Sequence, residues 1–387
     1  MKSATLTKSP PANKGNSTMK EIIAGNLLRY RKGLNLSQEE LAELTGVTRQ
    51  SINNYENAKT LPDSKTLSAL ARALGIKLDD LLRQESTTIP NFRFRADTCF
   101  DKKPQFVAQV LRLLEDYTAL EQVVGIPSYA PESTPCHQLE GNEKRIAKIA
   151  NLFRYRLGLG SGPILNLFEA VEEIGLKVLR QDIPISDFFG LSACSPEQGA
   201  FVLVNTHNIN IERQLFTLAH EIGHLIFHQD EYQDTLIREG SEKEEKAREK
   251  VAHYFANHLL VSQEALDQAL DVFTDLILLK AHFRVSYTMM LMRLEQMGKL
   301  KYGDAIQQIR QEYKRRTGQS LPKEMELDPV LPTEDFPVNQ RFTKLVWQAL
   351  SSGKISELKA AELLNLTIEN LRLTRREARG YAIDAIF

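Results

Sequence analysis

The sequence predicts an α+β fold that is mostly helical: an N-terminal bundle of five short helices, a middle domain in which a small β-sheet precedes long helices, and a helical C-terminal segment. Helical patterns with capping residues recur through most of the chain. Only three short runs, at 176–180, 188–194 and 200–205, have strand-like composition between turn signals. The length of 387 residues exceeds one ordinary core and favours two or three domains.

The composition is that of a globular protein. Charged residues make up 26% and hydrophobic residues 42%, and the formal net charge of -1 excludes a uniformly basic coat for nucleic acid. The first residues lack the apolar core of a signal peptide and no run is long enough to span a membrane, so we expect a cytoplasmic protein without membrane contact. The cysteines, Cys99, Cys136 and Cys194, lack Cys-x-x-Cys spacing, and we expect reduced thiols.

The N-terminal region predicts an arm followed by a helical bundle. Residues 1–18 are polar and rich in residues that break helices, which predicts a disordered arm. Residues 19–84 then carry five short helical patterns separated by Gly, Asn, Pro or a capping residue. They lie at 20–31, 37–45, 48–57, 63–74 and 78–82.

The second and third of these patterns have the spacing of a helix-turn-helix. Ser37 caps the first helix, Gly46 makes the turn and Thr48 caps the second. Polar side chains then face outward at the start of the recognition helix, where Arg, Gln and Asn can bond to base edges in the major groove, and the front of the first helix can contact a phosphate. The alternative is a helical bundle with a merely polar surface. The predicted DNA-binding residues are Gln38, Thr48, Arg49, Gln50, Ser51, Asn53 and Asn54.

The remainder divides into three regions. Residues 85–140 predict a linker with one helix at 105–123. Residues 141–300 predict one domain, with helices at 142–157 and 163–174, the three strands, helices at 211–227 and 241–260, and further helices to about 299. Residues 301–387 predict helices at 339–351, 355–364 and 368–377. The last two resemble a second helix-turn-helix without a glycine turn, and are a candidate module for nucleic acid or a partner.

The helix at 211–227 contains the motif His220-Glu221-Ile222-Gly223-His224. A helix returns to the same face after about four residues, so the two imidazoles can bind one metal ion while Glu221 lies at its open side. Hydrolytic zinc sites use three protein ligands and leave one position for water. The motif therefore predicts a zinc hydrolase, and the alternative is a pair of core histidines.

A third ligand is expected from the charged run at 241–250, which otherwise has the composition of a solvated face. Glu249 lies three residues before Ala252 and six before Phe255, on the apolar side of that helix. Register thus favours Glu249 over Glu245. Glu221 is then placed to take a proton from the attacking water and pass it to a leaving amine.

Three nearby residues have other interpretations. His228 continues the same helical stripe and is interpreted as structural or as an orienting partner of a ligand. His253 could also orient a ligand or meet a developing oxyanion, although packing is favoured for it. Cys194 is interpreted as a buried, inert thiol.

Two family resemblances add to these inferences. Residues 20–83 resemble the XRE-type helix-turn-helix through residues 36–42, 46–48 and 55–57. Residues from about 145 to 300 resemble the ImmA/IrrE family of zinc metallopeptidases through 212–224, 249–256, 259–260, 285–286 and 292–294. The second resemblance implies a zincin-like fold, with zinc on His220, His224 and Glu249, and Glu221 as the base. That family commonly continues Leu-Leu-Met-Pro where this chain has Val261-Ser262 after Leu259-Leu260.

The sequence leaves two functions open. The first is a DNA-binding regulator with zinc endopeptidase activity, with the sheet edge holding the substrate backbone as an added strand. The resemblance implies repressor-like regulators as substrates, in stress or mobile-element responses, and the chain could also cut itself. The second is a non-enzymatic regulator or antitoxin-like partner with a structural zinc site. Double-stranded DNA and a protein substrate are the expected partners, and a homodimer is possible on DNA.

Overall fold

The computed structural model describes residues 18–34, 36–76, 78–82, 93–96, 104–185, 187–229, 242–322 and 325–384. The chain forms two compact units: residues 1–89 with 101–111, and residues 90–100 with 112–387. The predicted arm lies outside the described residues except for Thr18, which caps the first helix. A mostly helical fold with a small sheet is confirmed.

The first unit contains the five predicted helices, with ends that differ from prediction by at most two residues. Ser37 and Glu40 form a reciprocal capping box at the second helix, and Gly46 ends that helix in the left-handed conformation, with φ of 70°. The apolar side chains of Leu27, Leu41, Ile52, Leu70 and Leu81 are fully buried between the helices. The helices are α1 (Met19–Gly33), α2 (Gln38–Thr45), α3 (Arg49–Glu56), α4 (Ser64–Ala73) and α5 (Leu78–Leu82).

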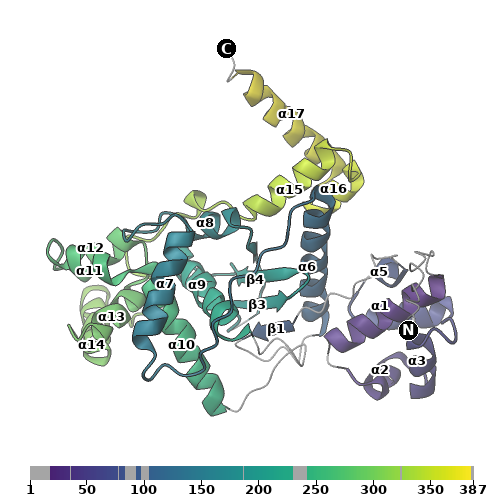
Figure 1. The fold of residues 1–387 in the computed structure, drawn as a ribbon, viewed down its shortest axis with the longest axis horizontal. Helices are drawn as coiled ribbons and strands as arrows, with labels where there is room; N and C mark the ends of the chain where they lie inside the picture. The colour runs from purple at the N-terminus through teal and green to yellow at the C-terminus, as the bar shows by residue number, and fades with distance from the viewer. Residues whose placement is uncertain are drawn as a thin grey trace, which may run out of the picture. The chain divides into compact units, whose positions relative to one another are not determined.

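The larger unit places helices around one sheet (Figure 1). Helix α6 (Pro104–Val124) crosses the division between the units. The other elements are β1 (Arg93–Ala96), α7 (Glu143–Arg156), α8 (Leu167–Glu173), β2 (Lys177–Gln181), β3 (Gly190–Ser195), β4 (Gly199–Asn205), α9 (Ile211–Phe227), α10 (Glu242–Leu260), α11 (Gln263–Leu270), α12 (Leu276–Phe283), α13 (Tyr287–Gln296), α14 (Tyr302–Thr317), the 3-10 turn η3 (Thr333–Asp335), α15 (Gln340–Ser351), α16 (Glu357–Leu363) and α17 (Ile368–Asp384).

The sheet has four strands in the order β1-β3-β4-β2, where three were predicted. β3 is antiparallel to both of its neighbours, and β2 is parallel to β4. The prediction was wrong about β1, because its four residues lie in a stretch interpreted as linker and pair only with a distant strand. Helix α8 also begins later than predicted, at Leu167, because Asn166 caps it by accepting a hydrogen bond from the backbone of Glu169.

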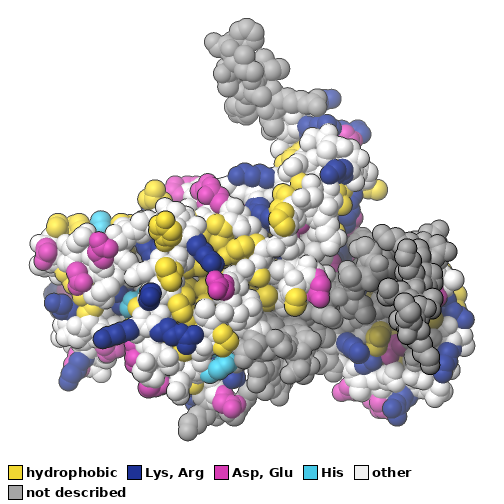
Figure 2. Space-filling view, viewed as in Figure 1, with side chains coloured by type: hydrophobic (Ala, Val, Ile, Leu, Met, Phe, Trp, Pro, Cys, Tyr) yellow, Lys and Arg dark blue, Asp and Glu magenta, His cyan; other side chains and the backbone are white. Residues whose placement is uncertain are grey.

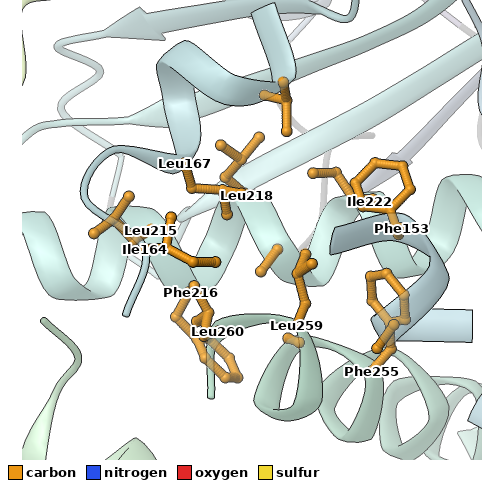
Figure 3. Packing of buried hydrophobic residues seen from close by; sticks show 14 of the residues in the cluster. Phe153, Ile164, Leu167, Leu215, Phe216, Leu218, Ile222, Phe255, Leu259 and Leu260 are labelled. Atoms are coloured by element: carbon orange, nitrogen blue, oxygen red, sulfur yellow. The ribbon is translucent and has the colours of Figure 1, made fainter. Parts of the chain in front are cut away.

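Helix α9 runs through the centre of this unit, with β3 and β4 on one side and α10 on the other. Nearly all of its side chains are buried, which matches its apolar composition on every face. Leu215, Leu218 and Ile222 of α9 belong to the same cluster of buried apolar side chains as Phe255 and Leu259 of α10 (Figure 3). A Cβ atom on Gly223 would lie 3.1 Å from the Cα of Ala252, so glycine lets the two helices approach closely.

We call residues 325–339 the strap, because this segment packs across the N-terminal half of α9. The backbone N–H of Leu331 donates to Glu212 of α9 at 2.8 Å, and Lys280 of α12 donates to the Pro329 carbonyl at 2.8 Å. Arg180 of β2 donates to both the Phe336 carbonyl, at 2.6 Å, and Gln214 of α9. The strap therefore joins the C-terminal helices to the metal-motif helix.

Helices α16 and α17 form the predicted C-terminal helix pair, and Asn365 between them has a positive φ of 52°. Asparagine thus takes the backbone conformation for which glycine is the usual residue. On the face in Figure 2, basic, acidic and apolar side chains are intermixed over the described surface of the larger unit. Among the described residues, none of the helices combines the length and apolar character needed to cross a membrane.

Candidate metal centre and DNA-reading helix

The metal motif lies on one uninterrupted helix. Asn210 starts α9 by accepting a hydrogen bond from the backbone N–H of Arg213, and the helix continues to Phe227 without a break. His220 and His224 are one turn apart, and both imidazoles are buried. Their Nε2 atoms lie 3.0 Å from each other. The helical spacing therefore brings the two rings to one point, as the sequence predicted.

Glu249 of α10 closes this group. One of its carboxylate oxygens lies 3.1 Å from Nε2 of His220 and the other 3.2 Å from Nε2 of His224. Burial opposes ionisation of Glu249, but hydrogen bonds from His220 and His224 outweigh it and hold the pKa of Glu249 below its usual range. Two nitrogen ligands and an ionised carboxylate thus converge.

Glu245, the alternative third ligand, lies one turn earlier and has a different contact. Its carboxylate accepts a hydrogen bond from Arg248 at 2.8 Å, on a half-buried part of α10. The apolar stripe of α10, including Ala252 and Phe255, is fully buried against α9. Glu245 and Glu249 share one side of α10, and it is Glu249, one turn further along the helix, that lies next to the histidines.

The three converging side chains fit a zinc ion. Tetrahedral zinc with ligands at about 2.0–2.1 Å places those ligands about 3.3 Å from one another. The observed separations of 3.0, 3.1 and 3.2 Å are close to this value. Two imidazoles and one carboxylate are also a donor set typical of catalytic zinc, which keeps a fourth position open.

His253 lies beside this group on the next turn of α10. Its ring centroid is 4.6 Å from that of His220, and Phe216 stacks on both rings. Ligand atoms of His253, His220 and Glu249 fall within 4.8 Å of one another, a looser set than the three that include His224. Burial, with a further contribution from His220, lowers the pKa of His253 to about 4, so the ring is neutral at pH 7.

Glu221 is buried beside the sheet, on the turn between the two histidines. Its Oε2 accepts a hydrogen bond of 2.6 Å from the hydroxyl of Ser192, in the middle of β3. This bond fixes the direction of the carboxylate. The sequence analysis missed Ser192, and no local pattern marks it, because its partner is 29 residues away in the chain.

His228 orients His224. Nδ1 of His224 lies 2.8 Å from Nδ1 of His228, and Nε2 of His228 lies 3.0 Å from the carbonyl oxygen of Cys136. If Nε2 of His224 binds a metal, its Nδ1 carries the proton and donates to His228, which then donates from Nε2 to that carbonyl. His228 is thus placed to orient His224, which is one of the two roles that the sequence left open for it.

Replacing His228 by Phe is expected to weaken zinc binding by about 10–100-fold, because the ring volume is kept while the support of His224 is lost. Zinc affinity measured by competition with a chelator checks this. His207→Gln, at an exposed histidine outside the group, is the matched control and should bind zinc normally. Equal affinities for the two variants would contradict the orienting role.

One cavity of this unit lies away from the three converging side chains. It has a volume of about 670 Å³ and is lined by residues including Phe189, Arg213, Tyr287 and Arg310, but by none of the three converging side chains. Arg213 stacks on Phe189 and, more loosely, on Phe216, which stacks on His220. The candidate site is therefore identified by the geometry of its donor atoms and not by this cavity. Cys194 is buried as expected, and burial raises the pKa of its thiol to about 11.

The predicted DNA-reading residues lie at the front of α2 and along α3. Thr48 caps α3 by accepting from the backbone of Ser51, and Arg49 and Gln50 are exposed in its first turn. Ser51, Asn53 and Asn54 are half-buried, and Gln50 donates to Asn54 at 3.1 Å. The side-chain amide of Gln38, assigned to a phosphate by the sequence, donates to Glu56 at 2.7 Å.

Glu56 connects this motif to the bundle. The carboxylate is buried and also accepts two hydrogen bonds from Arg31 of α1, at 2.5 and 3.0 Å. Because Gln38 and Arg31 meet on one carboxylate, the front of α2 and the end of α3 are fixed relative to α1. The motif therefore has a rigid base, while its exposed face is formed by Arg49 and Gln50.

Replacing Arg49 by Ala is expected to weaken binding to a selected operator by about 10–100-fold, through loss of one bidentate base contact worth about 1–3 kcal/mol. The operator is selected from random DNA with the intact chain, and binding is measured by fluorescence anisotropy at fixed salt. Arg72→Ala removes another exposed arginine of the same unit, on α4, and should cost far less. Equal losses would remove Arg49 from the reading face.

Comparisons with known proteins match both parts of the chain. Residues 27–81 match the family described as helix-turn-helix, and residues 166–295 match the peptidase family described as the IrrE N-terminal-like domain. The first match covers α2 and α3, and the second covers the helix with His220, His224 and Glu221 together with Glu249. Both resemblances seen in the sequence are thereby confirmed.

Two relatives of known name each align with less than a fifth of this chain. Control protein C.SmaI of Serratia marcescens is 40% identical over 17% of this chain and 80% of its own length. The prophage-derived HTH-type transcriptional regulator YonR of Bacillus subtilis is 40% identical over 16% of this chain and 57% of its own length. A Mycobacterium tuberculosis transcriptional regulator aligns with 46% of this chain and 52% of its own, at 16% identity and a TM-score of 0.30. This last similarity is too low to indicate the role of any residue.

Proposed function

We propose a function from one premise: the chain belongs to the helix-turn-helix family of transcriptional regulators and carries an IrrE N-terminal-like peptidase domain. It is a DNA-binding regulator that hydrolyses peptide bonds at a zinc site, and its substrate is a repressor-like regulator or the chain itself. The convergence of His220, His224 and Glu249 within 3.2 Å carries this proposal. Zinc held there supplies Lewis-acid activation of water and of the scissile carbonyl.

Side chains of the protein carry out the proton transfer and stabilise the developing negative charge. Glu221 takes a proton from the attacking water and delivers it to the nitrogen of the leaving amine. The hydroxyl of Ser192 keeps the Glu221 carboxylate in position while the proton is transferred. Neutral His253, beside His220, can donate a hydrogen bond to oxygen as negative charge develops on it.

The helix-turn-helix supports the choice of substrate. A peptidase fused to a DNA-reading domain is concentrated at the sites where that domain binds, and other DNA-bound regulators share those sites. The cellular test compares new protein N-termini between cells with the wild-type chain and cells with Glu221→Gln. A transcription regulator cut only in the wild-type cells is the expected result, and an identical set of N-termini in both strains would refute proteolysis of other proteins.

A second function is favoured by one observation, the position of His253. If His253 joined His220, His224 and Glu249 as a fourth ligand, the site would be closed, as structural zinc sites are. The chain would then be a non-enzymatic regulator or antitoxin-like partner with a structural zinc. The ligand atoms of His220, His224 and Glu249 lie within 3.2 Å of one another, whereas the set with His253 is defined only within 4.8 Å, and three ligands with one position free make an open site.

Replacing His253 by Phe separates the two functions. At an open site the variant is expected to keep one zinc per chain and to hydrolyse its substrate about 10²–10³-fold more slowly, the loss typical of removing one hydrogen-bond donor to an oxyanion. At a closed site it would lose zinc instead. Metal analysis of the purified variant beside the wild-type chain gives the answer without any substrate.

A further inference from the structure

The edge of the sheet beside the metal-motif helix is covered by the chain itself. β1 is the outermost strand and pairs antiparallel with β3 through four residue pairs, from Arg93 opposite Cys194 to Ala96 opposite Leu191. The sequence analysis assigned this edge to a substrate backbone added as a strand. That position therefore holds an extended segment of this chain, in the backbone conformation that β-addition requires.

This pairing is adjacent to the catalytic base. Arg95 lies directly opposite Ser192, and the hydroxyl of Ser192 donates to Glu221 at 2.6 Å. Residues directly opposite each other in an antiparallel pair have Cα atoms about 4.5–5.5 Å apart. One residue of β3 thus donates a hydrogen bond to the base from its side chain and lies directly opposite a residue of β1.

The position of β1 in the sequence determines which fragments a cut in this strand would produce. It lies after α5, the last helix of the DNA-reading unit, and before α6. Any cut between Arg93 and Ala96 divides the chain into a fragment with all five helices of that unit and a fragment with His220, His224, Glu249 and Glu221. Hydrolysis there would break the covalent link between the five helices and the candidate metal centre.

We propose that one of the three peptide bonds within Arg93–Ala96 is a substrate of the chain's own peptidase site and is cut in cis. This inference rests on the proposed function and names its substrate. The oxygen of water bonds to the carbonyl carbon, the carbon–nitrogen bond breaks, and the proton taken by Glu221 passes to the leaving nitrogen. Water is the only co-reactant, and a carboxylate and an amine are the products.

Pairing with β3 favours the cis reaction. It holds the β1 backbone extended and beside the base without a bimolecular encounter, so the entropy of binding a separate peptide is avoided. The rate is then first order in the chain. Dilution leaves it unchanged, whereas cleavage between chains slows in proportion.

The experiment uses the full chain, purified in chelator and then loaded with Zn²⁺. Intact-mass spectrometry is expected to show a new N-terminus at Phe94, Arg95 or Ala96, at a rate that is unchanged by hundredfold dilution. The Glu221→Gln chain should be cut about 10²–10⁴-fold more slowly. Cleavage confined to other positions, or a rate that falls with dilution, overturns the proposal.

Mixing the two chains tests cis action directly. Isotope-labelled Glu221→Gln chain is incubated with an excess of unlabelled wild-type chain and Zn²⁺. The labelled chain is expected to remain intact while the wild-type chain is cut. Cleavage of the labelled chain would show that molecules cut one another and would overturn the proposal.

A matched pair of variants tests the strand pairing. Phe94→Gly with Arg95→Gly weakens the strand, while Phe94→Tyr with Arg95→Lys keeps strand-forming side chains of similar size. Strand propensities span about 1 kcal/mol per position, so the glycine variant should be cut at least about tenfold more slowly and the conservative variant within about twofold of wild type. Equal rates for the two variants overturn the role of pairing.

Different experimental results would refute this inference and the proposed function. If the zinc-loaded chain stays intact while Glu221-dependent cleavage of another protein occurs in cells, the inference is wrong and the proposed function stands. If the glycine variant cuts that other protein faster than wild type while neither chain is itself cut, β1 is an inhibitory occupant of the edge and not a substrate, which also overturns the inference. If neither the chain nor another protein is cut, the proposed function fails as well.

Discussion

The Glu221→Gln chain is expected to keep its zinc and to hydrolyse its substrate about 10²–10⁴-fold more slowly than wild type, the range that a positioned proton-transfer group contributes. The amide has nearly the shape of the carboxylate, and Glu221 is not among the three converging side chains, so zinc content should stay at one per chain. Ser192 can still donate to the amide oxygen, which keeps the side chain in place. Rates are measured on the protein identified by its new N-terminus.

Ser192→Ala is the companion to this substitution. It leaves the Glu221 carboxylate intact and removes only the hydrogen bond that orients it, so kcat should fall far less than in Glu221→Gln while KM is unchanged. If Glu221→Gln retained wild-type kcat with zinc bound, another group would be the base. If it lost zinc, the variant would report on folding of the site and not on proton transfer.

Replacing Glu121 by Ala is expected to destabilise the larger unit by about 3–5 kcal/mol, the cost of breaking a buried ion pair from one side. Glu121 of α6 is fully buried, 2.9 Å from the ammonium of Lys177 in β2 and 2.7 Å from the guanidinium of Arg341 in α15. Burial lowers the pKa of Lys177, and the nearby Glu121 acts against that shift. Without Glu121, two buried cations would face each other with no carboxylate between them.

Urea unfolding followed by tryptophan fluorescence measures this effect. The chain has one tryptophan, Trp347, which lies on α15 and therefore reports on this unit. Glu362→Ala is the control, because Glu362 forms a partly exposed ion pair with Arg112, worth about 0–1 kcal/mol. Equal changes in the free energy of unfolding for the two variants would mean that Glu121 is not the central charge of this network.

Helices whose ends are marked by capping residues and by the apolar pattern of the sequence were predicted closely. Helix α9 has the bounds predicted for it, because Asn210 caps its start and the apolar pattern ends at Phe227. Strand β1 was missed, because its four residues have no partner nearby in sequence and only pairing with β3 defines them as a strand. Helix α8 was extended too far toward its N-terminus, where Asn166 is the capping residue.

In the candidate site, too, the features set by local helical geometry were predicted, and those set by the tertiary fold were not. The spacing of His220 and His224 and the register of Glu249 depend on helical geometry alone, and the structure brings these three side chains together. The bond from His228 to the carbonyl oxygen of Cys136 joins residues 92 positions apart, and no sequence pattern could indicate it. Ser192 was missed for the same reason. Residues that bind can be found from spacing, whereas residues that orient them depend on the tertiary fold.

The strap limits how the peptidase-family domain of this chain can vary in evolution. The matched peptidase family ends at residue 295, yet Arg180 holds Gln214 of the metal-motif helix with one side of its guanidinium and the Phe336 carbonyl with another. Phe336 itself is buried against Phe168. A gene rearrangement that replaced the chain after residue 300 would remove the contacts of the strap with α9. It would also uncover Phe168, against which Phe336 packs. Descendants with a different C-terminal module should therefore either retain residues 325–339 or carry compensating substitutions at Arg180, Gln214 and Phe168.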